Sequence, residues 1–414
     1  MRRPEGITQG MVEVATERAP EEAASSAVAS PVPVDLMVSA GEASGDAHAA
    51  HALAALAARG VSFTSFGMGA GALAREGTEL VVDCRDLAVI GIVDVVLNYP
   101  KFLARLRRLR EAMRSRRPDL LVIVDYPDFN LRLARTAREL GIPVLFYISP
   151  QVWAWRAKRV RGIGALVTHM AVLFPFETDI YERAGVPVSY VGHPLVDDAR
   201  SPYTPAEARE RFGLPVTTPL VTLLPGSRTG EIRRHLPLML ESAARLRERL
   251  PHCRFLLALA PTLERAAFDE ALAAHDLPIT VVADETRHAM RAADAVLCAS
   301  GTATLETALI GTPLVVLYVV APLNHAIMSR LIRIPDIALV NIVAGRRIVP
   351  EYLQNAATPA VLADELHALV TDETRAGAMR EELAEVARRM GEGGASDRVA
   401  ALIERLLRAT RTAP

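Results

Sequence analysis

The sequence predicts an α/β protein with two Rossmann-like halves, each built on a parallel sheet. Short apolar runs such as "VDLMVSA" and "DLLVIVD" alternate with longer amphipathic runs such as "DAHAAHALAALAARG". The short runs show no polar alternation, which indicates strands buried on both faces of a parallel sheet. The same alternation restarts after the turn-rich "GHPLVDDARSPYTP". We therefore expect two such domains whose sheets face each other across a cleft.

Composition excludes several classes of protein. The 414 residues are 50% hydrophobic, enough for more than one compact core. A formal net charge of −1 and a pI near 6.8 argue against a nucleic-acid partner held by general electrostatic attraction. Cys84, Cys253 and Cys298 form no CxxC pair, so neither a disulfide framework nor a zinc site is expected. This cysteine usage fits a reducing cytoplasm.

Changes in composition suggest four segments along the chain. Residues 1–33 are rich in Ala, Glu, Pro and Ser without an apolar period, which predicts a disordered leader. Residues 34–198 and 199–355 form the first and second domains. Residues 356–414 predict helices that pack back on the first domain or exchange with a partner chain. No apolar run is long enough to span a membrane, so any membrane contact should be at its surface.

Two loops of the second half have the features of a phosphate site. In "VTLLPGSRTGEI" a strand ends in Gly226, Ser227 and Arg228. The glycine permits close backbone approach and the guanidinium suits a phosphate. The alternative for this loop is an ordinary tight turn with a solvated arginine.

The second of these loops is "VLCASGTATLETALIGTP", a strand and a helix joined by small residues. Exposed amides at a helix N-terminus bind anions, so a diphosphate could rest on Ser300, Gly301, Thr302 and Ala303. Glu306, a turn further on, could accept hydrogen bonds from ribose hydroxyls. Its alternative is a glutamate that caps the first helical turn, and both roles can coexist.

The first half has its own strand-ending loops. In "SAGEASGDAHAA", Glu42, Ser44 and Asp46 lie in a glycine-containing turn that is neither GxGxxG nor a Walker motif. In "VDYPDFNLRLA", Asp125 and Asp128 follow a buried strand. No D-x-D sequence or His/Asp/Glu cluster has metal-ligand spacing, so no divalent metal is expected. His193, at the connector, either faces the cleft or bonds backbone at a hinge.

These motifs together resemble the lipid-A-disaccharide synthase family of GT-B glycosyltransferases. The matching strings run in family order from about residue 35 to 355: "SAGEASGD", "LAVIGIVDVV", "RPDLLVIVDYPDFNLRLA", "YISPQVWAWR", "FPFE", "VGHPL", "LLPGSRTGEI", "SGTATLE", "GTPLVV" and "NIVAGRRIVPEYLQ". The resemblance implies a GT-B fold and inverting transfer of 2,3-diacylglucosamine from its UDP conjugate to the 6-hydroxyl of lipid X, 2,3-diacylglucosamine 1-phosphate. It implies no metal or other cofactor, and it suggests a homodimer with exchanged C-terminal segments.

Inverting transfer requires a base for the acceptor hydroxyl and stabilisation of the departing UDP. In the family the aspartate of the "PDFN" motif is implicated in catalysis, which assigns the base to Asp128. Asp46 is the rival base, whereas Asp125 and Asp119 have positions that favour structural roles. We expect Arg228 and the turn at Ser300 to hold UDP.

The remaining polar loops of the first half are expected near the substrates. Glu42 and Ser44 are placed to meet the acceptor or the donor sugar. Gln151, Trp153 and Trp155 in "SPQVWAWR" follow another strand and could line the cleft. The alternative for the tryptophans is an aromatic plug between helix and sheet.

Acylated substrates require contact with a membrane surface. Residues 89–117 predict a helix in which Phe102, Leu103, Leu106, Leu109 and Met113 share one face and arginines crowd the other. Such a helix could bind the inner-membrane surface from the cytoplasm. The alternative is a crossover helix whose arginines face water.

Two other functions would use part of the same sequence pattern. A UDP-N-acetylglucosamine 2-epimerase would share the two domains and the UDP site but would need no lipid acceptor. A non-catalytic nucleotide-sugar sensor would bind UDP and close its domains, yet it would not require an aspartate base in the cleft.

Overall fold

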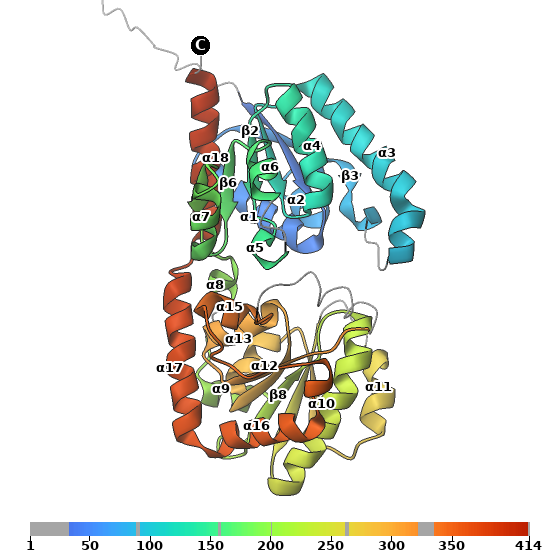
Figure 1. The fold of residues 1–414 in the computed structure, drawn as a ribbon, viewed down its shortest axis with the longest axis vertical. Helices are drawn as coiled ribbons and strands as arrows, with labels where there is room; N and C mark the ends of the chain where they lie inside the picture. Colours follow the sequence, from blue (N-terminus) through green and yellow to red (C-terminus); the bar gives the residue numbers. More distant parts are fainter. Residues whose placement is uncertain are drawn as a thin grey trace, which may run out of the picture. The chain divides into compact units, whose positions relative to one another are not determined.

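The computed structural model describes residues 33–87, 92–155, 159–199, 201–260, 265–321 and 335–412. The leader expected at residues 1–33 lies almost wholly outside these ranges, which begin at Pro33. Within them the chain forms two parallel sheets flanked by helices (Figure 1). The predicted α/β class with two parallel sheets is confirmed.

The first sheet has seven strands in the order β3-β2-β1-β4-β5-β6-β7. Every neighbouring pair is parallel. The strands β1 and β4 are apolar along nearly their whole length, as burial on both faces requires. The strands are β1 (Val34–Ala40), β2 (Phe63–Gly69), β3 (Glu79–Asp83), β4 (Leu120–Val124), β5 (Val144–Tyr147), β6 (His169–Val172) and β7 (Val188–Tyr190).

Successive residues of β1 contribute to two cores. Leu36 and Val38 pack in the core that contains Leu53 of α1, whereas Met37 packs in the core that contains Leu109 of α3. This alternation places α1 on one face of the sheet and α3, α4 and α6 on the other. The helices of this part are α1 (Ala43–Ala58), α2 (Gly71–Arg75), α3 (Ile92–Arg116), α4 (Pro127–Glu139), α5 (Val152–Trp155), α6 (Val160–Gly164), α7 (Pro175–Glu182) and α8 (Leu195–Asp198), with a 3-10 turn at Cys84–Leu87.

The helix α3 is a crossover helix over the part whose side chains are described. Leu106, Leu109 and Met113 are buried against the sheet, and Phe102 packs beside them. The apolar face that the sequence suggested for a membrane therefore belongs largely to the domain core. Residues 89–91 and the side chains of residues 92–98, which belong to the same predicted stretch, lie outside the described part of the chain.

The second sheet has six strands in the order β10-β9-β8-β11-β12-β13, again all parallel. The strands are β8 (Leu220–Leu224), β9 (Arg254–Leu259), β10 (Ile279–Ala283), β11 (Ala295–Ala299), β12 (Leu314–Tyr318) and β13 (Glu351–Leu353). The helices around it are α9 (Pro205–Arg211), α10 (Thr229–Arg249), α11 (Ala266–Ala273), α12 (Thr286–Ala292), α13 (Thr302–Ile310) and α15 (Leu339–Ala344), with a 3-10 turn at Gln354–Ala356.

Three helices complete the chain: α16 (Pro359–Thr371), α17 (Glu373–Met390) and α18 (Ala395–Thr412). The helix α16 packs on α10, α17 packs on α13 and α15, and α18 packs on α1 of the first sheet. Arg398 of α18 donates from Nε to the carbonyl oxygen of Val191 over 2.7 Å. Arg59 and Glu404 form an ion pair of 2.8 Å between α1 and α18. In Figure 1 the red helices α17 and α18 run along the left side of the ribbon, and α16 crosses its lower part.

Within the described ranges, none of the helices is both long and apolar enough to cross a membrane.

Candidate active site

Each sheet has one position where the strand order reverses direction. In the first sheet this lies between β1 and β4, and in the second between β8 and β11. Ligands of open parallel sheets bind at the carboxyl ends of the strands beside such a reversal. Four of the loops selected from the sequence begin at these four strand ends, whereas the loop of Gln151 and Trp153 follows β5. The predicted site loops are thereby brought together in two pairs.

The loop after β4 has a strained backbone. Asp125 and Tyr126 adopt φ values of +46° and +48°, a left-handed conformation that costs energy for residues other than glycine. The buried amide of Asn130 stabilises it: Nδ2 lies 3.1 Å from the carbonyl oxygen of Val124 and 2.7 Å from that of Asp125. Ser39, in β1, donates to Oδ1 of Asn130 over 2.7 Å, so the two strand ends are tied together.

This turn directs Asp128 outward. The residue lies in the first turn of α4, with 78% of its side chain exposed. A helix N-terminus stabilises a negative charge at this position. Among the described residues, the guanidinium of Arg159 forms an ion pair with it at 3.5 Å. Asp128 is thus an accessible carboxylate on a rigid element, as a general base requires.

Asp125 is half-buried below this turn. Burial raises the pKa of its carboxyl, and the nearby charge of Glu42 raises it further. Glu42 and Ser44 are exposed at the start of α1, after β1. The acidic loops after β1 and β4 are therefore close enough to influence each other.

Asp46 is not presented to solvent. It is buried, and its carboxylate accepts backbone N–H bonds from Ala70 at 2.6 Å, Ala72 at 2.8 Å and Leu73 at 3.3 Å. The side chain stabilises the start of α2, which favours a structural role over that of the rival base.

The loop that contains Trp153 is held in place by contacts with α7. Trp153 donates from Nε1 to Glu177 over 3.2 Å and packs edge-on against Phe176. Burial raises the pKa of Glu177, whose carboxylate also accepts from Ser149 at 2.6 Å. Trp153 therefore fits the aromatic plug, while Gln151 is exposed in the loop between β5 and α5. The side chain of Trp155 lies outside the described residues.

His193 lies in the buried connector after β7. Its Nδ1 accepts the backbone N–H of Leu195 over 3.1 Å, and its ring packs on Phe174. Burial, with a smaller contribution from His48, lowers the pKa of His193 to about 3. The ring is neutral at physiological pH and bonds to backbone, as in the hinge alternative.

The loop after β8 is shaped around Glu231. Gly226 has a φ of +117°, and a Cβ there would lie 2.6 Å from Oε2 of Glu231. The same oxygen accepts the backbone N–H of Ser227 over 3.2 Å. Arg228 pairs with Glu231 at 3.2 Å but keeps 76% of its side chain exposed. The guanidinium is therefore accessible to an anion.

The loop after β11 leads directly into α13. Gly301 and Thr302 are exposed and Ala303 is half-exposed at the helix start, where the first amides have no helical acceptor. Ser300 donates to the carbonyl oxygen of Ile337 over 3.2 Å, which fixes the turn. Glu306 is held by Arg287 of α12, with Nε 2.7 Å from Oε1.

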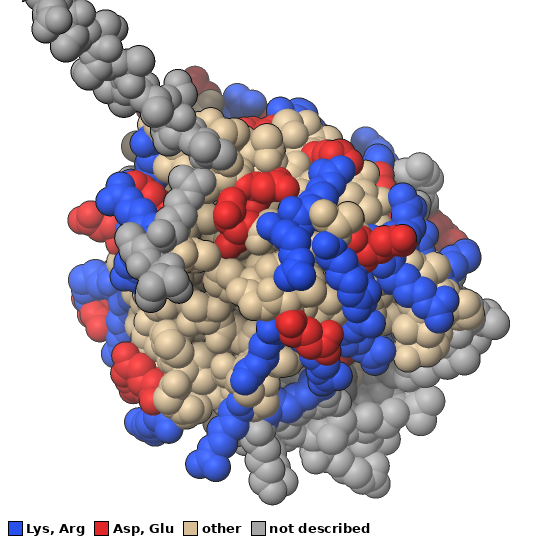
Figure 2. Space-filling view, turned by 90° about the horizontal axis from the view of Figure 1, so that it is seen from above, with Lys and Arg blue, Asp and Glu red and all other residues tan. Residues whose placement is uncertain are grey.

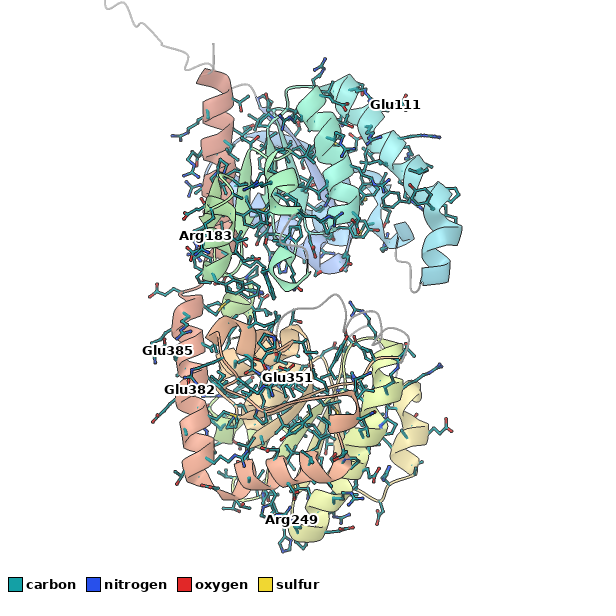
Figure 3. The ribbon with its side chains drawn as sticks, viewed as in Figure 1. Glu111, Arg183, Arg249, Glu351, Glu382 and Glu385 are labelled. Atoms are coloured by element: carbon teal, nitrogen blue, oxygen red, sulfur yellow. The ribbon has the colours of Figure 1, made fainter. Side chains whose placement is uncertain are left out.

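Three supporting residues were not found from the sequence. Arg159 and Arg287 reach Asp128 and Glu306 from other elements, and no local pattern marks them. Glu351, labelled in Figure 3, accepts N–H bonds from Ile337 at 2.8 Å and Ala338 at 3.1 Å. Glu351 thereby fixes the backbone at Ile337, whose carbonyl oxygen accepts the hydroxyl of Ser300.

Within the described ranges, no three His, Cys, Asp or Glu side chains come together in a way that could hold a metal ion.

Comparison with known proteins identifies the family. Residues 36–402 match the family described as lipid-A-disaccharide synthetase. The chain is 45% identical over 372 residues to the lipid-A-disaccharide synthase of Geobacter sulfurreducens, covering 90% of this chain and 97% of that one. It is 44% identical over 379 residues to that of Myxococcus xanthus, covering 91% and 98%.

The chain belongs to the lipid-A-disaccharide synthase family. The resemblance drawn from the sequence motifs is confirmed. A member of this family is a glycosyltransferase of lipid A biosynthesis, so the expectation of an enzyme is confirmed as well.

Solved structures support the fold of this lipid-A-disaccharide synthase family member. MurG of Acinetobacter baumannii matches with a TM-score of 0.55 at 16% identity, over 90% of this chain and all of that one (100%). The calicheamicin glycosyltransferase CalG4 matches with a TM-score of 0.60 at 16% identity, over 92% and 100%. The UDP-GlcNAc 2-epimerase of Neisseria meningitidis matches with 0.58 at 13%, over 90% and 100%. At these identities the likeness concerns the fold alone, which is GT-B.

Proposed function

We propose that the protein transfers 2,3-diacylglucosamine from UDP-2,3-diacylglucosamine to the 6-hydroxyl of lipid X with inversion, forming the β-1,6 disaccharide and UDP. The family supplies the substrate class, a UDP-sugar and a lipid acceptor. The observation that carries the mechanism is the contrast between the two candidate bases. Asp128 is exposed on the first turn of α4, whereas Asp46 is buried among three backbone amides.

In this mechanism the Asp128 carboxylate takes the proton of the acceptor hydroxyl while the oxygen attacks the anomeric carbon. The bond to UDP breaks on the opposite face, and the electron pair leaves with the diphosphate. Negative charge that develops on the diphosphate is stabilised by Arg228 and by the amides of Thr302 and Ala303. Glu306, oriented by Arg287, accepts hydrogen bonds from the ribose hydroxyls. No metal takes part.

We also propose a membrane contact, with fewer residues of α3 than the sequence suggested. Since Leu106, Leu109 and Met113 are buried, an attraction to the inner-membrane surface depends on the arginines of α3 and on the beginning of that helix. Arg107 and Arg108 are exposed. Their charge reversal should weaken co-sedimentation with anionic liposomes, and unchanged co-sedimentation would exclude this contact. The protein is then cytoplasmic and peripherally bound.

A homodimer with exchanged C-terminal segments is also proposed. Within one chain α18 packs on α1. In an exchanged dimer, α18 of each chain would make the same contact with α1 of the partner chain. Analytical ultracentrifugation of the full chain tests this, because a single monomeric species would exclude it.

The function itself is tested with UDP-2,3-diacylglucosamine and lipid X in mixed micelles, with EDTA present. The proposal predicts UDP release and a product whose new linkage is β-1,6 by NMR. Turnover of UDP-N-acetylglucosamine without acceptor would instead indicate an epimerase. UDP binding without any product would indicate a sensor.

A further inference from the structure

A groove of about 680 Å³ lies beside Asp128 on the first domain. It is formed by α3, α4 and the segment that contains α6. Its apolar residues come from all three elements and its cations are all arginines. The half-buried apolar side chains Leu103, Leu131, Leu166 and Pro127 line it above the buried Leu106 and Ile163, and the cations are Arg110, Arg132, Arg135 and Arg159.

The arginines of this groove are weakly neutralised. Within the described ranges, Arg110, Arg132 and Arg135 have no carboxylate within ion-pair distance, and Arg159 has only Asp128, at 3.5 Å. Nε of Arg110 is buried without a hydrogen-bond acceptor. Burial, together with the charges of Arg114, Arg135 and Arg132, lowers the pKa of Arg110. The groove thus holds several positive charges close together, which is electrostatically unfavourable. A bound anion would reduce this repulsion.

The same charge continues along α3. A second hollow of about 600 Å³ is lined by Arg107, Arg110, Glu111, Arg114 and Ser115. Glu111, labelled in Figure 3, is the carboxylate on this stretch of helix. Figure 2 shows Lys and Arg side chains gathered over the right half of this end of the molecule, with Asp and Glu fewer among them.

This combination fits an anionic amphiphile. Leucine and isoleucine side chains favour an acyl chain, because burial of each methylene is favourable. Guanidinium groups bind phosphate oxygens in a bidentate manner. A phosphate and a hydroxyl carried by one sugar ring would come close to Arg159 and Asp128 respectively, since these two side chains are themselves neighbours.

We propose that this groove binds the acceptor lipid, with an acyl chain on the apolar side chains, the phosphate on the arginines and the sugar hydroxyl at Asp128. The inference rests on the proposed function and specifies where that function takes its acceptor. The donor is assigned to the loops after β8 and β11, so the two substrates would have separate sites.

The phosphate part is tested with the double variant Arg132→Ala and Arg135→Ala. Arg135 has no hydrogen bond or ion pair among the described residues. Arg132 contacts the exposed Tyr99 and the half-buried ring of Phe102 and, through its carbonyl oxygen, Arg110. The matched control is Arg138→Ala, an exposed arginine on the same helix that does not line the groove. We expect KM for lipid X to rise about tenfold or more, with KM for the donor within about twofold.

Two further readouts separate this role from a general defect. With an acceptor that lacks the 1-phosphate, the double variant and the wild type should have equal KM values. The variant Leu131→Gln should raise KM for long-chain lipid X but leave KM for a short-chain analogue unchanged.

Direct binding of radiolabelled lipid X below its micellar concentration, without donor, separates this proposal from the proposed function. Binding that the double variant weakens, even without turnover, would support the groove. Wild-type turnover with equal acceptor KM values in wild type and double variant would overturn it. Reduced binding to anionic vesicles with an unchanged KM for a short-chain phosphorylated acceptor would also overturn it, because the groove would then be a membrane contact.

Discussion

The Nδ2 atom of Asn130 lies 2.7 Å from the carbonyl oxygen of Asp125, within a turn whose backbone is left-handed at two successive residues. Asn130 is fully buried, and its Oδ1 accepts a hydrogen bond from the hydroxyl of Ser39. One side chain on α4 thus fixes the ends of both β1 and β4. The position of Asp128, two residues earlier, depends on this network.

Replacing Asn130 with aspartate should destabilise the fold. The substitution keeps the shape but removes the donors, leaving carbonyl oxygens unpaired around a buried carboxyl. We expect a loss of about 2–4 kcal/mol in the free energy of unfolding, measured by chemical denaturation. Asn355→Asp, at an exposed position, is the control and should change stability little. Equal stabilities of the two variants would contradict the assigned network.

Asp46→Ala should affect folding more than turnover. The variant loses the acceptor of three backbone N–H groups at the start of α2. We expect a lower Tm, equivalent to about 1–3 kcal/mol, with kcat of the folded protein within a few-fold of wild type. The measurement is a thermal melt paired with the micelle assay at a temperature where both proteins are folded. A large fall in kcat at an unchanged Tm would restore Asp46 as a base.

Gly226→Ala should weaken donor binding. The new Cβ would displace Glu231, which holds both Ser227 and Arg228, and φ at this position is +117°. We expect the Kd for UDP, measured by calorimetry, to rise about tenfold. Gly213→Ala is the control, since it has a φ of +64° and open space around it. Gly213→Ala should lower the free energy of unfolding but leave the Kd for UDP unchanged. A similar rise in Kd for this control would show that the loss of binding does not arise from the loop at Gly226.

His193 should contribute to acid sensitivity. Its pKa in the fold is about 3, below its ordinary value of 6.5, so the unfolded chain binds more protons and stability falls as pH drops below about 6.5. Between pH 7 and pH 5 this single group should cost about 2 kcal/mol.

The variant His193→Asn can still accept the N–H of Leu195 but does not titrate. Denaturation at the two pH values should show a smaller loss for it than for wild type. His252→Asn, at an exposed site, should keep the wild-type loss. The half-buried His48 and His169 and the buried His235 also have lowered pKa values, so only the difference between variants is informative.

The sequence was sufficient for the sheets and for the positions of the site loops. Uniformly apolar strands separated by helices imply parallel sheets, and the loops at Gly41, Asp125, Gly226 and Ser300 each follow such a strand. Strand order decides which loops become neighbours, and that order is a tertiary property. The pairing of β1 with β4 and of β8 with β11 was therefore not available from local pattern.

Roles that depend on distant partners were the hardest to predict. Asp46 lies in a turn that reads as a ligand loop, but its partners are amides at residues 70–73. The leucines of α3 form an amphipathic face, and periodicity cannot say whether a membrane or a sheet covers it. The groove beside Asp128 combines three helical segments, so no single stretch of sequence contains its signal.

The most direct test of the account is turnover by Asp128→Asn in mixed micelles with UDP-2,3-diacylglucosamine and radiolabelled lipid X, alongside UDP binding by calorimetry. The control is Asp179→Asn, because Asp179 is also an exposed aspartate near an arginine, 3.9 Å from Arg183, which is labelled in Figure 3. We predict a fall in kcat of about 100-fold or more for Asp128→Asn, with unchanged Kd for UDP and unchanged Tm, and wild-type turnover for the control. Near wild-type disaccharide synthesis by Asp128→Asn would contradict the assignment of the base.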